Sequence, residues 1–72
     1  MARYGTWRTF GPGILEYVDS GGSMLGIIHE KSHGMWESRY GSYIEYWTNK
    51  RDAKEWVEDM AVKGVRSRRR LR

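Results

Sequence analysis

The apolar pattern of the chain changes its period once, close to residue 48. Before that point, short runs alternate apolar and polar residues and are separated by glycine-containing turns such as Gly21-Gly22 and Gly41-Ser42. After it, apolar residues recur at the i, i+3, i+4, i+7 spacing of a helix, at Ala53, Trp56, Val57 and Met60. An amphipathic helix needs an apolar surface to cover, and a sheet made of the earlier runs supplies one. The sequence therefore predicts an α+β fold.

The predicted sheet is an antiparallel meander of three to four strands packed on one C-terminal helix. Its candidate strands are residues 14–19, 24–31, 35–40 and 43–47, because short turns join them in order along the chain. Residues 1–13 contain three glycines and Pro12, which predicts an irregular arm with at most a short strand at 6–10. One domain is therefore expected over residues 14–64.

The helix is predicted over residues 50–63. Thr48 or Asn49 can accept a hydrogen bond from a free backbone N–H at its start, and Gly64 suits the left-handed residue that commonly ends a helix. Residues 65–72 are too polar and too strongly charged to pack by themselves, so we expect them to form a disordered tail.

The basic residues are concentrated at the C-terminal end. The chain has 13 Lys and Arg against 9 Asp and Glu, and five of the arginines lie within the last seven residues. Setting those five aside leaves 8 basic and 9 acidic residues, so the rest of the chain is nearly neutral. Guanidinium groups pair with the phosphates of nucleic acids and release condensed counterions. Such a tail can also bind acidic protein surfaces, contact anionic lipid or increase solubility. The candidate phosphate-binding residues are Arg66, Arg68, Arg69, Arg70 and Arg72.

Aromatic side chains make up 14% of the chain, which is more than one short core is expected to hide. A large ring buries about 150–250 Å², so some of the rings stabilise the fold. Because a single helix covers one face of the sheet, we expect others to face water, a stacked base or another protein. The rings concerned are Trp36, Tyr40, Tyr43 and Trp47. The alternative is that the N-terminal arm folds over them through Trp7 and Phe10.

The stretch His29-Glu30-Lys31-Ser32-His33 matches the H-E-x-x-H pattern of zinc metalloproteases. That chemistry needs both imidazoles on one face of a helix, whereas this stretch follows a strand pattern and ends in a turn. We therefore interpret both histidines as polar residues beside a hairpin turn, and we expect no metal and no cofactor. The chain has no cysteine and its serines lie mostly in turns, so the sequence predicts a protein that is not an enzyme.

Three features occur together between Leu25 and Val57. They are a Trp-bearing strand at 35–39, a Gly-Ser turn before the strand at 43–47, and a Trp47-Thr48 step leading into a helix that contains Ala53. In these features the segment resembles the sheet-plus-helix modules of arm-site-binding domains of phage-type integrases and of Apetala-type plant transcription factors. The resemblance implies a sheet that lies in the DNA major groove, and it nominates Trp36, Ser38 and Arg39 for base contact. The segment departs from the usual basic sheet of those families because it carries Glu37 and Glu45.

These observations predict a small accessory protein of phage or mobile-element origin that binds nucleic acid, DNA in preference to RNA. The C-terminal arginines would contact phosphates, and Trp36 and Arg39 would contact bases from the sheet. The alternative is a protein-interaction module, either a homo-oligomer or an inhibitor of a host protein. No apolar run approaches the ~20 residues that cross a bilayer, and no apolar leader pattern is present. We therefore expect no membrane partner and a cytoplasmic location.

Overall fold

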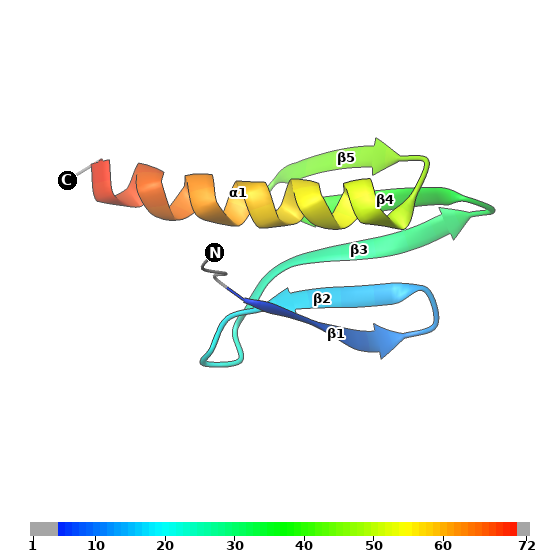
Figure 1. Ribbon diagram of the computed structural model, residues 1–72, viewed down its shortest axis with the longest axis horizontal. Helices are drawn as coiled ribbons and strands as arrows, with labels where there is room; N and C mark the ends of the chain where they lie inside the picture. Colours follow the sequence, from blue (N-terminus) through cyan, green and yellow to red (C-terminus); the bar gives the residue numbers. More distant parts are fainter. Residues whose placement is uncertain (1–4, 71–72) are drawn as a thin grey trace.

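The computed structural model describes the backbone of residues 5–70 and the side chains of residues 5–63. It contains five strands and one helix: β1 (Thr6–Gly11), β2 (Ile14–Val18), β3 (Met24–Ser32), β4 (Met35–Tyr40), β5 (Tyr43–Trp47) and α1 (Lys50–Arg70). The strands form one antiparallel sheet in the order β1-β2-β3-β4-β5, which is their order in the chain (Figure 1). The predicted α+β meander is confirmed, but the predicted count of three to four strands is wrong.

The additional strand is β1, which occupies most of the segment predicted to be an irregular arm (1–13). It pairs with β2 from Thr6↔Val18 to Gly11↔Ile14, with a bulge between Thr9 and Gly11. Gly11 lies at this bulge, and Gly13, with φ 69°, lies in the turn that follows. Gly13 therefore supplies the left-handed conformation that the turn needs, whereas Gly11 lies at the bulge without a positive φ.

The helix begins where the sequence predicts and extends further than predicted. Asn49, rather than Thr48, caps it: its Oδ1 accepts a hydrogen bond from the Asp52 N–H at 2.8 Å. α1 continues past Lys63 to Arg70 and projects beyond the sheet (Figure 1). Gly64 does not end the helix, because glycine keeps its N–H donor and costs only about 1 kcal/mol relative to alanine. The side chains of residues 64–72 lie outside the described part of the chain.

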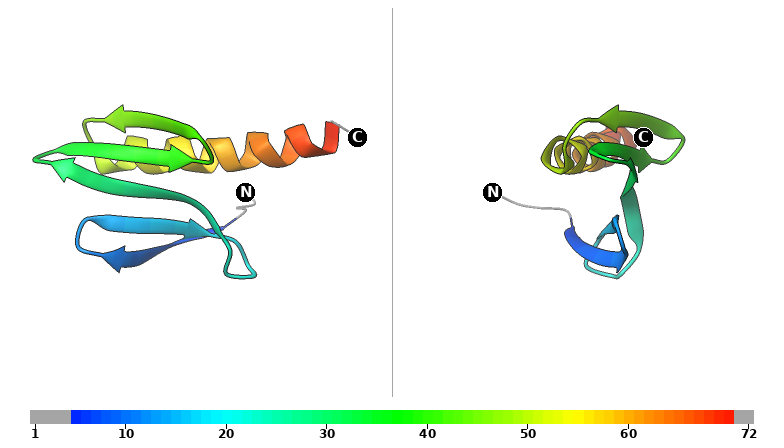
Figure 2. Two further views of the ribbon diagram at one scale, coloured as in Figure 1. Left: turned by 180° about the vertical axis from the view of Figure 1, so that it is seen from behind. Right: turned by 90° about the vertical axis from the view of Figure 1, so that its right-hand side faces the viewer.

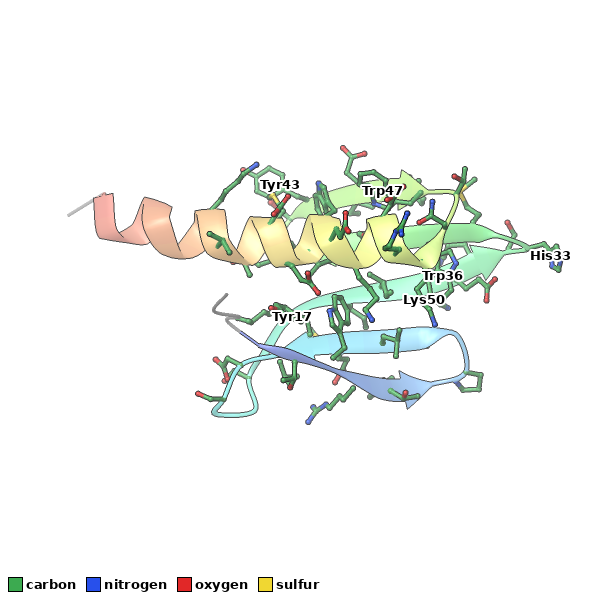
Figure 3. The ribbon with its side chains drawn as sticks, viewed as in Figure 1. Tyr17, His33, Trp36, Tyr43, Trp47 and Lys50 are labelled. Carbon is green, nitrogen blue, oxygen red and sulfur yellow. The ribbon has the colours of Figure 1, made fainter. Side chains whose placement is uncertain are left out.

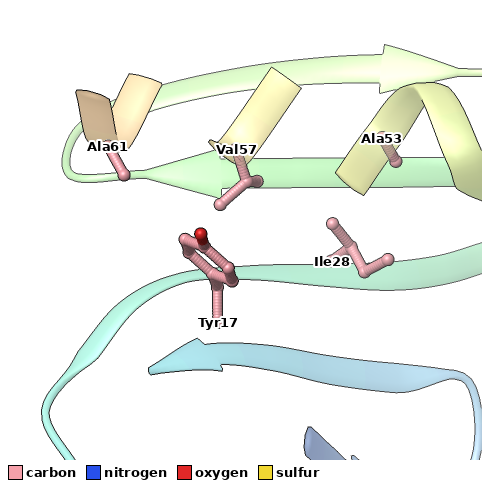
Figure 4. Close-up of a cluster of buried hydrophobic side chains, with 5 residues drawn as sticks. All are labelled: Tyr17, Ile28, Ala53, Val57 and Ala61. Carbon is pink, nitrogen blue, oxygen red and sulfur yellow. The ribbon is translucent and has the colours of Figure 1, made fainter. Parts of the chain in front are cut away.

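The hydrophobic core lies between α1 and the middle of the sheet. It consists of Tyr17 and Ile28 from the sheet and Ala53, Val57 and Ala61 from the helix (Figure 4). The predicted apolar stripe of the helix is thereby confirmed, with Trp56 and Met60 half-buried at its margins. α1 packs mainly on β4, and also on β3 and β5.

Close packing of α1 on the sheet depends on Gly26 in β3. A Cβ atom at this position would lie 2.6 Å from Val57 Cγ1 and 2.9 Å from the backbone oxygen of Arg39. Both distances are shorter than a carbon atom can tolerate, so only glycine lets the helix come this near to β3.

The sheet has one face covered by α1 and one that is not (Figure 2). The fully buried Ser38 marks the covered face, because its hydroxyl donates to the Ala53 carbonyl in α1 at 2.9 Å. Side chains alternate along a strand, so Glu37 and Arg39 point to the other side. Strand register extends this uncovered side across the sheet. We call it the open face; its members include Arg8, Glu16, Ile27, His29, Glu37, Arg39, Ile44 and Tyr46.

The β1–β2 hairpin is joined to α1 through Trp7 on the covered face. The Trp7 indole donates from Nε1 to Glu58 Oε2 at 2.8 Å. Its ring lies 4.9 Å from the Tyr17 ring, centroid to centroid, and the Lys54 ammonium lies 5.5 Å from its centroid. This one side chain therefore contacts both layers of the molecule.

Candidate functional site

The aromatic residues singled out in the sequence lie mainly on the covered face. Trp36, Tyr40 and Trp47 are half-buried and pack against the core. Tyr43, at the start of β5, is exposed (Figure 3). Of the two arm residues expected in the alternative, Phe10 is itself exposed, whereas Trp7 is half-buried and packs against the same core as these rings.

The two sheet residues predicted to contact nucleic acid lie on opposite faces. Trp36 faces α1, where the Lys50 ammonium lies 5.8 Å from its ring centroid (Figure 3). Arg39, three residues along the same strand, lies on the open face and is exposed. Ser38, also nominated by the resemblance, is fully buried and donates to the helix. A ligand on one surface of the sheet therefore meets Arg39 without Trp36 or Ser38.

A hydrogen-bonded group on the open face links β4 and β5. The Glu37 carboxylate accepts a hydrogen bond from Arg39 Nε at 3.1 Å through one oxygen, and from the Tyr46 hydroxyl at 3.1 Å through the other. Glu37 is buried, whereas Arg39 and Tyr46 are exposed. We call these three residues the Glu37 platform. One buried carboxylate, that of Glu37, thus orients two exposed groups, the Arg39 guanidinium and the Tyr46 ring.

The protonation of the Glu37 platform follows from its contacts. Burial by itself raises the pKa of Glu37, but the hydrogen bonds from Arg39 and Tyr46 and the charges of Arg39 and Lys31 more than offset this, so the pKa falls below its ordinary value. The hydrogen bond to Glu37 and the charge of Glu37 raise the pKa of Tyr46. At neutral pH the carboxylate is therefore charged and the phenol keeps its proton.

A second pair of the same kind lies on β1 and β2. Arg8 contacts Glu16 Oε1 through Nη2 at 3.0 Å and through Nε at 3.1 Å. In both pairs the acid is largely buried and the arginine is largely exposed. The exposed fraction of the side chain is 57% for Arg8 against 11% for Glu16. It is 53% for Arg39 against 7% for Glu37. The outermost charges of the open face are therefore positive at both places.

Arg8 and Arg39 belong to the same row of neighbours across the sheet. The row runs Arg8, Glu16, Ile27, Arg39 and Ile44, one residue from each strand. Three strand spacings separate the two arginines, which is about 14 Å between backbones. They are far enough apart to meet separate phosphates of one chain.

The H-E-x-x-H stretch does not form a helix. Its first residues lie in β3, and His33 lies at the tip of the β3–β4 hairpin (Figure 3). Within residues 5–63, no three His, Cys, Asp or Glu side chains are grouped so that they could hold a metal ion. Among the described residues, no helix combines the length and the apolar character needed to span a membrane.

Sequence reasoning missed Arg8, Glu16, Glu37 and Tyr46 as site residues. A signal for two of them was present. The two-residue turn Gly41-Ser42 places Tyr40 opposite Tyr43, and therefore Glu37 opposite Tyr46. No comparable signal linked Arg8 with Glu16, because residues 1–13 were expected to be irregular.

The predicted phosphate contacts at Arg66, Arg68, Arg69, Arg70 and Arg72 lie outside the described side chains, and they remain predictions. No protein-family model matches this chain, and comparisons with curated proteins and with solved structures give no significant match.

Proposed function

We propose that this protein binds nucleic acid through the open face of its sheet, with the C-terminal arginines adding phosphate contacts. One observation carries the proposal: Arg8 and Arg39 are each held by a sunken carboxylate and are themselves more than half exposed. An arginine that is already oriented loses less conformational entropy when it pairs with a phosphate. The balance of charge in the body is nearly even, but in these two ion pairs the arginine is the exposed partner and the acid is the buried one.

The chemistry of the two ion pairs supports this function. Each guanidinium uses Nε in its ion pair, and Arg8 also uses one terminal nitrogen. Arginine has five N–H donors, so donors remain for phosphate oxygens in both cases. The five C-terminal arginines add sequence-independent affinity that falls as salt rises.

Fluorescence anisotropy with labelled DNA and RNA oligonucleotides at several salt concentrations tests the proposal. The double variant Arg8→Ala/Arg39→Ala should bind more weakly. Its plot of log affinity against log salt should be flatter by roughly 0.7–0.9 for each phosphate that the protein no longer neutralises. Truncation before Arg66 should flatten the plot further. A matched control, Arg51→Ala/Lys63→Ala, removes the same charge from α1 and should change binding less. Absence of binding to every oligonucleotide at low salt would disprove the proposal.

A second candidate function is self-association through β5. Among the described strands β5 is an unpaired edge of the sheet, and three of its five side chains are exposed hydrophobics: Tyr43, Ile44 and Tyr46. A free edge presents unpaired N–H and C=O groups that a second copy can pair with. In that arrangement two sheets would join edge to edge across a twofold axis.

Light scattering during size-exclusion chromatography separates the two candidates. Self-association predicts a mass above that of one chain that returns to one chain in Ile44→Lys, because a charge on a sheet edge opposes pairing. A single-chain mass at high protein concentration would exclude this second function and leave the first untouched.

A further inference from the structure

Tyr46 is tethered by its hydroxyl and remains exposed over more than half of its surface. Its hydroxyl donates to Glu37, which lies directly opposite on β4 and is buried. To reach a sunken group on the neighbouring strand, the side chain has to lean across β4 rather than stand away from the sheet. With 57% of Tyr46 still exposed, the outward side of the ring is open to a ligand.

Arg39 lies beside this ring on the same carboxylate. It uses Nε for Glu37, and its side chain remains more than half exposed. Ile44, directly opposite Arg39 and two residues before Tyr46, adds a partly exposed apolar surface next to both. The Glu37 platform therefore offers an aromatic face, an apolar edge and an oriented cation within one small area.

These groups match a nucleotide whose base is unpaired. In a duplex the faces of the bases are stacked on one another, and a protein reaches only base edges, sugars and phosphates. The Tyr46 hydroxyl already donates to Glu37, so what the residue offers a ligand is chiefly its ring. An unpaired base can stack on that ring while its phosphate pairs with Arg39.

We infer that the Glu37 platform binds a single-stranded segment of nucleic acid, with one base stacked on Tyr46 and a neighbouring phosphate on Arg39. The inference rests on the proposed nucleic-acid binding and specifies the form of its ligand. Stacking on a ring is tolerant of sequence, because every base has a face, so little preference among the four bases is expected.

Anisotropy with a single-stranded DNA oligonucleotide, the RNA of the same sequence and the corresponding DNA duplex tests this inference. The single strands should bind more tightly than the duplex. Tyr46→Ala should weaken single-strand binding about tenfold, whereas Tyr46→Phe, which keeps the ring, should weaken it less. Tyr43→Ala is the matched control, because Tyr43 is similarly exposed on the same strand but on the covered face. Thermal unfolding of each variant establishes that it is folded.

A second readout reports stacking itself. A 2-aminopurine base in the single strand should lose fluorescence when it stacks on Tyr46, and this quenching should persist in Tyr46→Phe and disappear in Tyr46→Ala. Duplex binding as tight as single-strand binding, together with unchanged affinity of Tyr46→Ala, would overturn the inference while the proposed function stands. If no oligonucleotide binds at low salt, the proposed function fails as well.

Discussion

Glu37 is the residue on which the open face depends most. It is a buried carboxylate with two donors, Arg39 and Tyr46, and both donors reach the surface. A buried carboxylate without donors would take up a proton, since burial disfavours its charge. Here the donors keep it charged, and it in turn keeps them in place. The contact geometry and the lowered pKa of Glu37 are thus two consequences of one arrangement.

We predict that Glu37→Gln lowers the free energy of unfolding at neutral pH by about 1 kcal/mol. The amide keeps only one acceptor oxygen, so one of the two hydrogen bonds from Arg39 and Tyr46 is lost, and the ion pair with Arg39 is lost with the carboxylate charge. The folded-state pKa of Glu37 is lowered, so its contribution is fully present above the unfolded value near 4.5 and is lost as pH falls through the folded value. Urea unfolding of wild type and variant at falling pH should show the difference shrink. Glu45→Gln, exposed on β5, is the control. A difference that stays constant into acid would contradict the assignment.

At the scale of the elements, the sequence was most informative from β3 onward, where short turns separate clearly alternating runs. The turns at Ser32–Gly34 and Gly41-Ser42 bounded β4 and β5, and the stripe beginning at Ala53 predicted the helix. For β1 the sequence indicates only a possible short strand at 6–10 within an irregular arm, because glycines on both sides of it are typical of loops. The end of α1 was misplaced because Gly64 can end a helix but does not have to.

The site was harder to predict than the fold, because alternation separates the two faces of a strand without saying which one the helix covers. On β4 both sets were plausible surfaces, with Trp36 and Ser38 on one side and Glu37 and Arg39 on the other. The hydroxyl of Ser38 decides the matter by donating to Ala53 in α1. Ser38 lies between Trp36 and Tyr40 on the same side of β4 and is the most deeply buried of the three. Because serine is small and polar, the sequence does not indicate that it would be buried.

Packing between layers gives a prediction for Gly26. Replacement by alanine places a Cβ against Val57 and the Arg39 carbonyl, so α1 or β3 has to move. Gly26→Ala should lower the free energy of unfolding by about 1–3 kcal/mol. Gly11→Ala is a matched control, because a Cβ at Gly11 meets nothing within 4 Å, and it should stay within about 0.5 kcal/mol of wild type. Equal denaturation midpoints for the two variants would show that α1 can pack on β3 without a glycine at position 26.

At the scale of the whole molecule, the strands that carry Arg8 and Arg39 differ in how extensively they contact α1. Arg39 lies on β4, the strand that α1 covers most extensively. Arg8 lies on β1, at the far edge of the sheet, where Trp7 provides a side-chain connection to α1 through Glu58 and Lys54. The position of Arg8 relative to Arg39 therefore depends on the curvature of the sheet and on Trp7.

This dependence predicts a coupling between Trp7 and Arg8 in binding. Trp7→Phe keeps a ring beside Tyr17 but removes the donor to Glu58, so stability should fall by about 1 kcal/mol. The β1–β2 hairpin should then hold Arg8 less firmly, and affinity for a single-stranded oligonucleotide should fall. In an Arg8→Ala background the same substitution should have little further effect, because the guanidinium that Trp7 positions is already absent. Anisotropy on the four proteins of this cycle measures the coupling. Equal reductions in affinity in both backgrounds would mean that Trp7 stabilises the fold without positioning the cation.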